Sequence, residues 1–481
     1  MYPSLRTRAL LLFMAHQATM HIGTVTSLNV ALPAIMKEFH VDTTTVVWIQ
    51  LAYTLALVGG TIPLGQLSAA FSKRNQILIG QIIDIAALLI TFFTSSIIVI
   101  IIARFVSALA RTLPWLCLQI VGVGGFPPEQ RGKAVGLTRL VQGVAAIIAV
   151  PLTGLITDAW SWRWLFMGTA IISAGLTGLI WIWLPADKHE SMPIDPKKLD
   201  LVGSALIMIG AIGIVTALQS LVKGQTPVLS IIAGGIGIIA LVAFFKVERR
   251  MQAPILYLPL FGIRDIFVSA VQALFLGLAN GATLLLLPLL YINSYGWTTA
   301  YAGSILLFFN LVRPFSAFLG GWLADHYGTM PIIVFAALTL ISGQLVAALF
   351  GVDPPIGWLI ASLLLMGLGD ALAASANLRQ IFSAMPRPYL HLAPSTNIVL
   401  MLIGSTLGQA FVATTWELAS ASTSVEASNT VPIASMLLIV TGLVLAIGLL
   451  VAHLIPLVVP AVAKPSFAEP QTESTGKSTV H

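Results

Sequence analysis

Long apolar runs separated by short polar segments constrain this chain more than any other feature of its sequence. A helix needs about 20 apolar residues to cross the hydrocarbon core of a bilayer. Runs of this length recur along the chain. They are continuously apolar rather than alternating, which disfavours a β-barrel. Only 9% of the 481 residues are charged, against about 25% in a typical soluble domain. The sequence therefore predicts an all-α, multi-pass membrane protein and argues against a soluble enzyme.

We expect fourteen transmembrane helices. The least distinct boundaries are those between the third and fourth spans and around the long ninth span. The predicted ranges are 9–36, 45–70, 76–96, 97–122, 134–157, 163–185, 200–221, 228–247, 265–292, 298–322, 331–351, 355–382, 394–417 and 432–456.

Most basic residues lie on one side of the membrane in this predicted topology. If the N-terminus is cytoplasmic, seventeen Lys and Arg residues lie on cytoplasmic segments, and only Lys37, Arg163 and Lys223 lie on the opposite loops. The remaining four lie inside spans. Cytoplasmic loops of membrane proteins carry such an excess of positive charge. We therefore expect both termini to be cytoplasmic and the protein to lie in the plasma membrane, that is, the inner membrane of a bacterium.

A repeated segment divides the chain into halves. Gly-x-Leu followed by a small residue begins at Gly65, at the end of the second predicted span, and again at Gly321, at the end of the tenth. The second copy thus starts eight spans after the first, which predicts six spans, a two-span insert and six more spans. The expected units are an N-terminal six-helix bundle (1–185), a linker with the two-helix insert (186–264), a C-terminal six-helix bundle (265–456) and a disordered cytoplasmic tail (457–481).

Several motifs give the chain a specific resemblance. They are Asn29-Val30-Ala31-Leu32-Pro33, the two Gly-x-Leu segments, Arg104, Pro151 with Gly154, and Trp162-Arg163-Trp164-Leu165-Phe166. In these residues the chain resembles the major facilitator superfamily and, within it, the fourteen-spanner drug–proton antiporters, over roughly residues 10–456. The resemblance implies a secondary active transporter that works by alternating access.

The resemblance also implies gating motifs, and the chain departs from some of them. Gly65, Lys73 and Arg74 match the loop of the first half, and Asp325 and Gly328 match the loop of the second; the fifth-span motif keeps Pro151 and Gly154. In the first-half loop, Ala69 and Ser72 replace the family's Asp and second Gly. The latch of this half is therefore expected to be weaker or built differently.

Ionisable residues lie inside predicted spans, where each costs about 2.5–3.5 kcal/mol on insertion scales. Arg313 and Asp370 are each about 22 Å from the outer ends of their spans, so they could pair. Asp84 lies between the depths of Arg104 and Arg111 on the next span. These residues could form fixed ion pairs, or one carboxylate could exchange a proton during transport. We favour Asp370 as the proton carrier, with Arg313, Arg104, Asp84 and Arg111 as the rest of a charge relay.

Other polar residues at membrane depth are candidates for a substrate cavity. Thr24, Asn29, Asn280, Asn377 and Gln119 form this set, although Thr24 stands where the family's drug antiporters often carry an acid. His16 and His21 do not share a helix face, so no metal site is expected. No cofactor or nucleic-acid signature occurs, and no ATP-binding domain, so transport is expected to be ion-coupled or facilitated.

Two main functions remain open. The first is proton-coupled export of small amphipathic compounds, either drug-like or metabolites, as in multidrug efflux. The second is a carrier of an anionic or lipid-like substrate, with or without proton coupling. It is suggested by the excess of intramembrane arginines, four including Arg139, over intramembrane aspartates, of which there are two. The expected partners are a small-molecule substrate, protons and the lipid bilayer, and we expect a monomer. A receptor-like role is a third possibility.

Overall fold

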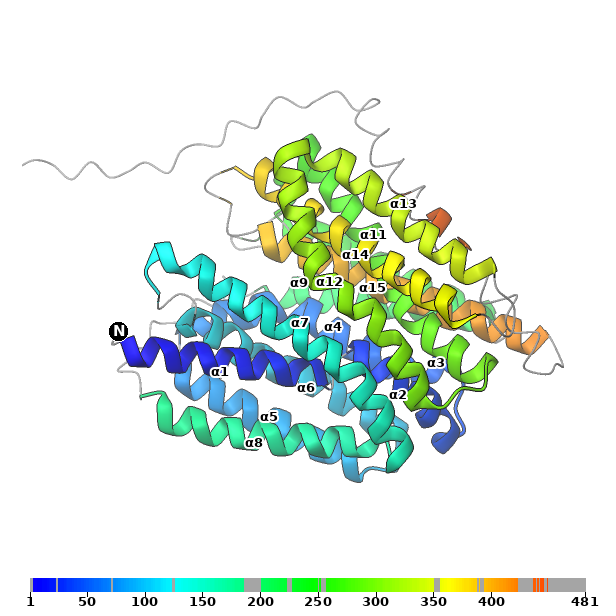
Figure 1. Cartoon of the computed structure of the whole chain (residues 1–481), viewed down its shortest axis with the longest axis horizontal. Coiled ribbons are helices and arrows are strands. Elements are labelled where there is room, and N and C mark those ends of the chain that lie inside the picture. Colours follow the sequence, from blue (N-terminus) through cyan, green and yellow to red (C-terminus); the bar gives the residue numbers. More distant parts are fainter. Residues whose placement is uncertain are drawn as a thin grey trace, which may run out of the picture.

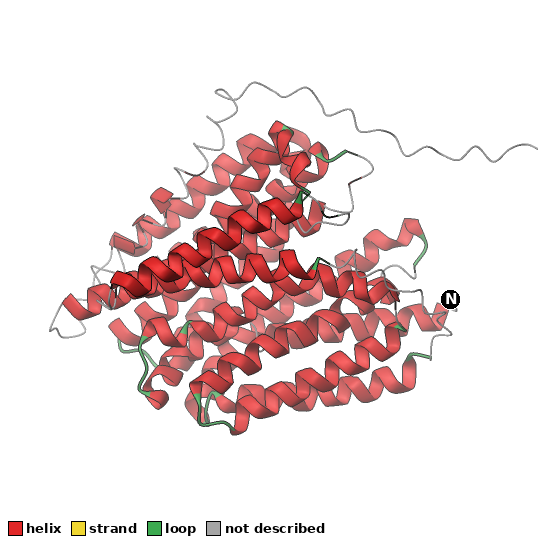
Figure 2. Cartoon of the chain, turned by 180° about the vertical axis from the view of Figure 1, so that it is seen from behind, coloured by secondary structure: helices red, strands yellow, loops and turns green. Residues whose placement is uncertain are grey.

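The computed structural model describes most of the chain up to residue 422. The described residues are 3–22, 25–70, 72–122, 126–185, 200–222, 227–249, 251, 257–349, 355–386, 389, 393–422 and short stretches between 436 and 448. Helices and short connections make up this part of the chain, with no strand among the described residues (Figure 2).

The helices follow one another in three groups along the chain. The first group is α1 (Pro3–Ile22), α2 (Val25–Phe39), α3 (Thr43–Val46), α4 (Trp48–Ala70), α5 (Lys73–Phe93), α6 (Ile97–Gly122), α7 (Pro128–Ala159) and α8 (Arg163–Trp183). The second is α9 (Leu201–Val222) and α10 (Pro227–Glu248). The third is η2 (Leu258–Gly262), α11 (Arg264–Leu289), η3 (Leu290–Ser294), α12 (Thr299–Tyr327), α13 (Thr329–Leu349), α14 (Ile356–Ala384) and α15 (Ala393–Ser422).

Twelve helices in the described residues are long and apolar enough to cross a membrane, not the fourteen predicted. They correspond to the second to thirteenth predicted spans. The first predicted span, 9–36, is divided between α1 and α2, and α1 begins in polar sequence with Arg6 and Arg8. Most of the fourteenth, 432–456, and the whole tail lie outside the described residues. The count of fourteen therefore stays a prediction.

The helices form two bundles (Figure 1), and α9 and α10 pack against each other as a hairpin. In the first bundle, α6 packs against α1, α4 and α5, and α8 packs against α1 and α5. In the second, α11 packs against α15, while α14 packs against α12 and α13. The hairpin α9–α10 contacts both α4 and α15, so it touches each bundle. Gln219 of α9 anchors it to the first bundle, accepting a hydrogen bond from Trp48 Nε1 and donating one to the carbonyl of Thr44.

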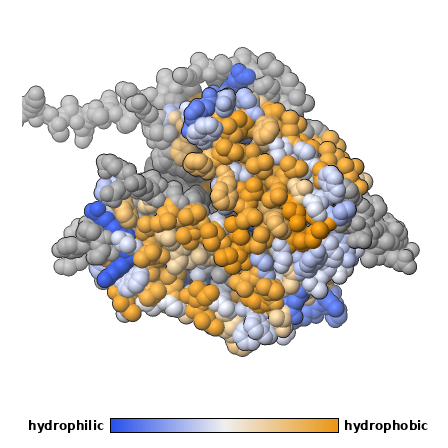
Figure 3. Space-filling model, viewed as in Figure 1, coloured by the Kyte–Doolittle hydropathy of each residue, from blue (hydrophilic) through white to orange (hydrophobic). Residues whose placement is uncertain are grey.

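Large apolar side chains cover the outside of the molecule. On α10, Ile231, Ile238 and Ile239 are 72%, 61% and 69% exposed. Apolar residues also dominate much of the face seen in Figure 3. Monomeric soluble proteins rarely expose contiguous apolar areas of this size. The surface is therefore that of a protein embedded in lipid.

The two bundles are joined where α7 ends and α12 begins, which we call the joined end. A Cβ added at Gly154 would collide with the carbonyl oxygen of Thr299, and one added at Gly303 would lie 2.9 Å from the carbonyl oxygen of Val150. The missing side chains thus let the two helices touch. Farther along, a Cβ at Gly143 would lie 2.7 Å from Pro314. Figure 1 shows the bundles meeting at this end and spreading apart toward the N-terminus.

Polar contacts also hold the joined end together. The Asp158 carboxylate of α7 accepts hydrogen bonds from the backbone N–H groups of Thr299 (3.2 Å) and Ala300 (2.5 Å) at the start of α12. A carboxylate is favourable there because the first N–H groups of a helix lack partners within the helix. Asn29 of α2 donates to the carbonyl of Leu284 in α11 at 3.0 Å.

Candidate functional site

A polar cluster of the second bundle surrounds Asp370. Its Oδ2 atom lies 2.9 Å from Nη2 of Arg313, and its Oδ1 atom accepts a hydrogen bond of 2.9 Å from Asn280 Nδ2. The three residues come from α14, α12 and α11. The Asp370 side chain is 3% exposed, whereas that of Arg313 is 31% exposed. We call Asp370, Arg313 and Asn280 the Asp370 cluster. The predicted pairing of Arg313 with Asp370 is present.

A glycine on α14 sets the distance between the helices of this cluster. Gly367 lies one turn before Asp370, and a Cβ there would collide with the carbonyl oxygen of Phe309 on α12. The close approach brings Asp370 within reach of Arg313, whose guanidinium also lies over the ring of Phe309, 5.1 Å from its centroid. A larger residue at 367 would push α12 and α14 apart.

The Asp370 cluster lies at the edge of the contact between the bundles. Pro314, which follows Arg313, is the residue that meets Gly143 of α7. Since Pro314 is 15 residues from Thr299, it lies about 22 Å along α12 from the joined end. A small cavity opens nearby between α7, α11 and α12, and Asn310 is its polar member; its lining is Val150, Leu284, Leu287, Pro288, Leu306, Phe309 and Asn310. Phe309 therefore contacts both the cavity and Arg313.

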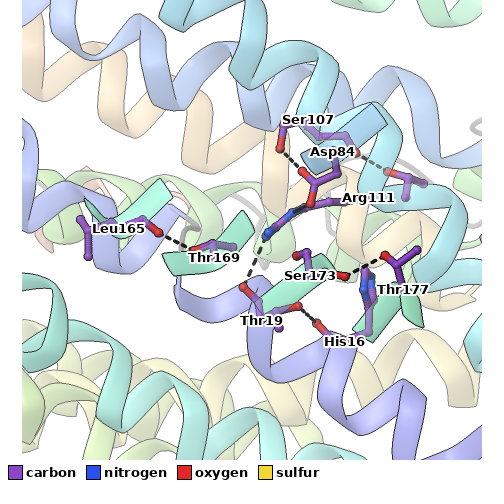
Figure 4. Close-up of polar contacts among 11 residues, drawn as sticks. His16, Thr19, Asp84, Ser107, Arg111, Leu165, Thr169, Ser173 and Thr177 are labelled. Atoms are coloured by element: carbon purple, nitrogen blue, oxygen red, sulfur yellow. Dashed lines mark hydrogen bonds and ion pairs between the residues drawn. The ribbon is translucent and has the colours of Figure 1, made fainter. Parts of the chain in front are cut away.

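A second polar cluster lies inside the first bundle (Figure 4). The Asp84 carboxylate of α5 accepts a 2.8 Å bond from Arg111 Nε and a 2.5 Å bond from the Ser107 hydroxyl, both on α6. Arg111 also donates to the carbonyl of Thr19 on α1 at 3.4 Å. Both charged side chains are only 1% exposed. We call Asp84, Ser107 and Arg111 the Asp84 cluster, and it is closed to the exterior.

Arg104 does not pair with Asp84, although sequence reasoning allowed this. Its guanidinium lies over the ring of Tyr53 on α4, 4.2 Å from the centroid, and 5.9 Å from that of Phe166 on α8. The residue is 1% exposed, and its side-chain nitrogens have no hydrogen-bond partner among the described residues. The hydrophobic sequence around Tyr53 gave no sign of this contact.

The predicted cavity residues do not share one site. Asn280 belongs to the Asp370 cluster, and Asn29 accepts a hydrogen bond from Gln50 while bridging to α11. Asn377 donates to Asn397 on α15 at 2.9 Å and is fully buried. Gln119 is exposed near the end of α6. Thr24 lies outside the described residues.

The loop motifs of the two halves are built differently. In the second half, Asp325 forms an ion pair with Arg379, which joins α12 to α14, and Gly328 follows with φ of +85°. In the first half, Gly65 lies in α4 and Lys73 begins α5. Arg74 donates to the Trp181 carbonyl at 2.8 Å and lies over its ring, which ties α5 to α8.

The fifth-span motif lies at the joined end. Pro151 and Gly154 belong to α7, and Gly154 is a point of contact with α12. Sequence reasoning missed Asp158, one turn further along the same helix. An acid directly after a predicted span was the available signal, but the sequence does not show that another helix starts beside it.

A model of the Major Facilitator Superfamily matches residues 17–413. The chain belongs to this superfamily. It is therefore a multi-pass membrane protein of a transporter superfamily, which agrees with its two bundles and its apolar exterior.

Relatives in the superfamily include antibiotic and multidrug resistance proteins. The lincomycin resistance protein of Streptomyces lincolnensis is 30% identical over 54% of this chain and 52% of its own length. Multidrug resistance protein 3 of Bacillus subtilis is 24% identical over 75% of this chain and 70% of its own length. The uncharacterized transporter YhcA of Bacillus subtilis is 28% identical over 66% of this chain. The matches span about half of the length of several of these relatives.

Solved structures share the fold. A bacterial homologue of the human lysosomal transporter Spinster, in an inward-facing and unoccupied conformation, superposes with a TM-score of 0.66 at 14% identity and covers 94% of this chain and 97% of its own. A peptide transporter of the POT family in complex with sulfate gives 0.64 at 16% identity, covering 95% of each chain. At these identities the likeness extends to the fold alone.

Proposed function

We propose that the protein is a proton-coupled exporter of small amphipathic compounds and that Asp370 carries the proton. Resistance to lincomycin and to multiple drugs in relatives supports export of such compounds. The observation that carries the proton assignment is the Asp370 cluster, a buried carboxylate bonded to a partly exposed arginine. Its position next to the contact between the bundles would let it change partners when the bundles move.

The chemistry of the cluster suits proton exchange. The Arg313 charge favours the ionised carboxylate, and separating the pair inside a low-dielectric site favours the protonated acid. A conformational change that moves α12 relative to α14 would therefore take up or release a proton. With a cytoplasmic N-terminus, the joined end would face outward, which would correspond to an inward-facing state of alternating access.

The experiment is transport driven by a proton gradient in everted membrane vesicles. Asp370→Asn should abolish gradient-driven accumulation of a lipophilic dye while the amount of protein in the membrane holds. Asp265→Asn, an exposed acid on α11, serves as the matched control and should transport normally. Undiminished accumulation by Asp370→Asn would remove this residue from the mechanism.

One observation favours a second function, transport of an anionic or lipid-like compound. Arg104, Arg111 and Arg313 outnumber Asp84 and Asp370 in the described spans, and an excess of positive charge repels cations. Matched cationic and anionic dyes of equal size separate the two functions. Preference for the anionic dye, unaffected by a protonophore, would favour the second.

A further inference from the structure

The first bundle encloses more positive than negative charge. Arg104 and Arg111 are each 1% exposed, and Asp84 is fully buried. Arg111 uses Asp84 as its partner. In the described part of the bundle interior, two guanidiniums thus share one carboxylate, and Arg104 has no ion pair of its own. Such a group is costly because a buried charge is stable only when it is paired and hydrogen-bonded.

The contacts of Arg104 differ between the face of its guanidinium and its N–H groups. The rings of Tyr53 and Phe166 lie 4.2 and 5.9 Å from the guanidinium carbon, so they contribute cation–π attraction. The N–H groups of a guanidinium lie in its own plane. Nε, Nη1 and Nη2 of Arg104 are all buried and have no hydrogen-bond acceptor among the described residues. The in-plane donors are therefore the unsatisfied part of the group.

The surroundings of these donors are rich in positive charge and in further donors. Arg104, Ser107 and Arg111 recur at helical spacing on one face of α6, and Ser107 already gives its hydroxyl hydrogen to Asp84. Tyr53 lies close to both arginines and brings a hydroxyl from α4. Water could satisfy hydrogen bonds here but not the charge. An anion satisfies both.

We propose that the first bundle binds a small monovalent inorganic anion, such as chloride, against the in-plane N–H groups of Arg104. A small ion is required because the site is closed to the exterior, unlike that of the partly exposed Arg313. The anion would be a structural partner of the bundle. The proposal is independent of what the transporter exports and of whether Asp370 carries a proton.

The test is binding of radiolabelled chloride to the purified full-length protein in detergent. Wild-type protein should bind chloride saturably, at about one ion per chain. Replacing gluconate by chloride at constant ionic strength should raise the midpoint of thermal unfolding by roughly 2–4 °C, since a ligand that binds only the folded state stabilises it. Both effects should disappear in Arg104→Gln.

The double variant Arg313→Gln/Asp370→Asn is the matched control, because it removes an intramembrane arginine from the other bundle together with its counter-charge. It should keep both the bound chloride and the thermal shift. The absence of saturable chloride binding in the wild-type protein would overturn the proposal, whether or not Arg104→Gln folds. Equal chloride binding by folded Arg104→Gln would overturn it as well.

Discussion

The two bundles each contain a buried aspartate paired with an arginine, and the pairs differ in their access to the exterior. The bond lengths are nearly equal, 2.8 Å for Asp84–Arg111 and 2.9 Å for Asp370–Arg313. Arg111 is 1% exposed and lies between α1, α5 and α6, whereas Arg313 is 31% exposed and lies beside the contact with α7. A carboxylate can exchange a proton during a cycle only if one of the states gives it a path to water. This difference supports our proposal that the Asp370 cluster exchanges a proton and that the Asp84 cluster stabilises its bundle.

The largest expected effect is on stability in the first bundle. Asp84→Asn leaves Arg111 buried without its counter-charge, and breaking a buried pair in this way costs about 3–5 kcal/mol. We expect a large fall in the midpoint of thermal unfolding and little folded protein. The double variant Asp84→Asn/Arg111→Gln removes both charges and should recover much of the loss. An Asp84→Asn protein as stable as wild type would show that the Asp84–Arg111 pair does not stabilise the first bundle.

A smaller effect is expected where α12 and α14 approach each other. Gly367→Ala places a methyl group against the Phe309 carbonyl, and overpacking of this kind costs about 1–3 kcal/mol. The displacement should also lengthen the Asp370–Arg313 bond, so transport should fall more than the amount of folded protein. Gly357→Ala on the same helix meets no atom within 4 Å and is the matched control. Equal transport by the two variants would show that the close approach does not set the geometry of the cluster.

The smallest effect is expected at the joined end. Asp158→Asn weakens the charged interaction with the start of α12, which is worth about 0.3–1 kcal/mol for an exposed carboxylate. The bundles should separate there more often, which can be measured as faster labelling of Thr299→Cys by a membrane-impermeant maleimide, with Cys117 replaced by Ser. We expect an increase of up to about fivefold. Slower labelling would mean that Asp158 does not hold the joined end closed.

The sequence predicted the helices well because lipid requires long apolar runs, and these can be counted. It also predicted the Arg313–Asp370 pair, because equal depth on two long helices is informative. It could not choose between Arg104 and Arg111 as the partner of Asp84, since the two arginines lie about two turns apart on α6, one on either side of that depth. The offset of α6 along its axis relative to α5 decides this, and it depends on packing. The contact of Asp158 with α12 could likewise not be predicted from the sequence, because it joins residues about 140 positions apart.

We propose that the Asp370 carboxylate, and not the Asp84 carboxylate, exchanges a proton with solution. The most direct measurement is the proton release that follows addition of a transported compound to purified protein in weakly buffered detergent solution, followed with a pH-sensitive dye. Wild type and the double variant Asp84→Asn/Arg111→Gln should both release protons, and Asp370→Asn should release none. Proton release that persists in Asp370→Asn, or that is lost in the folded double variant, would contradict the account.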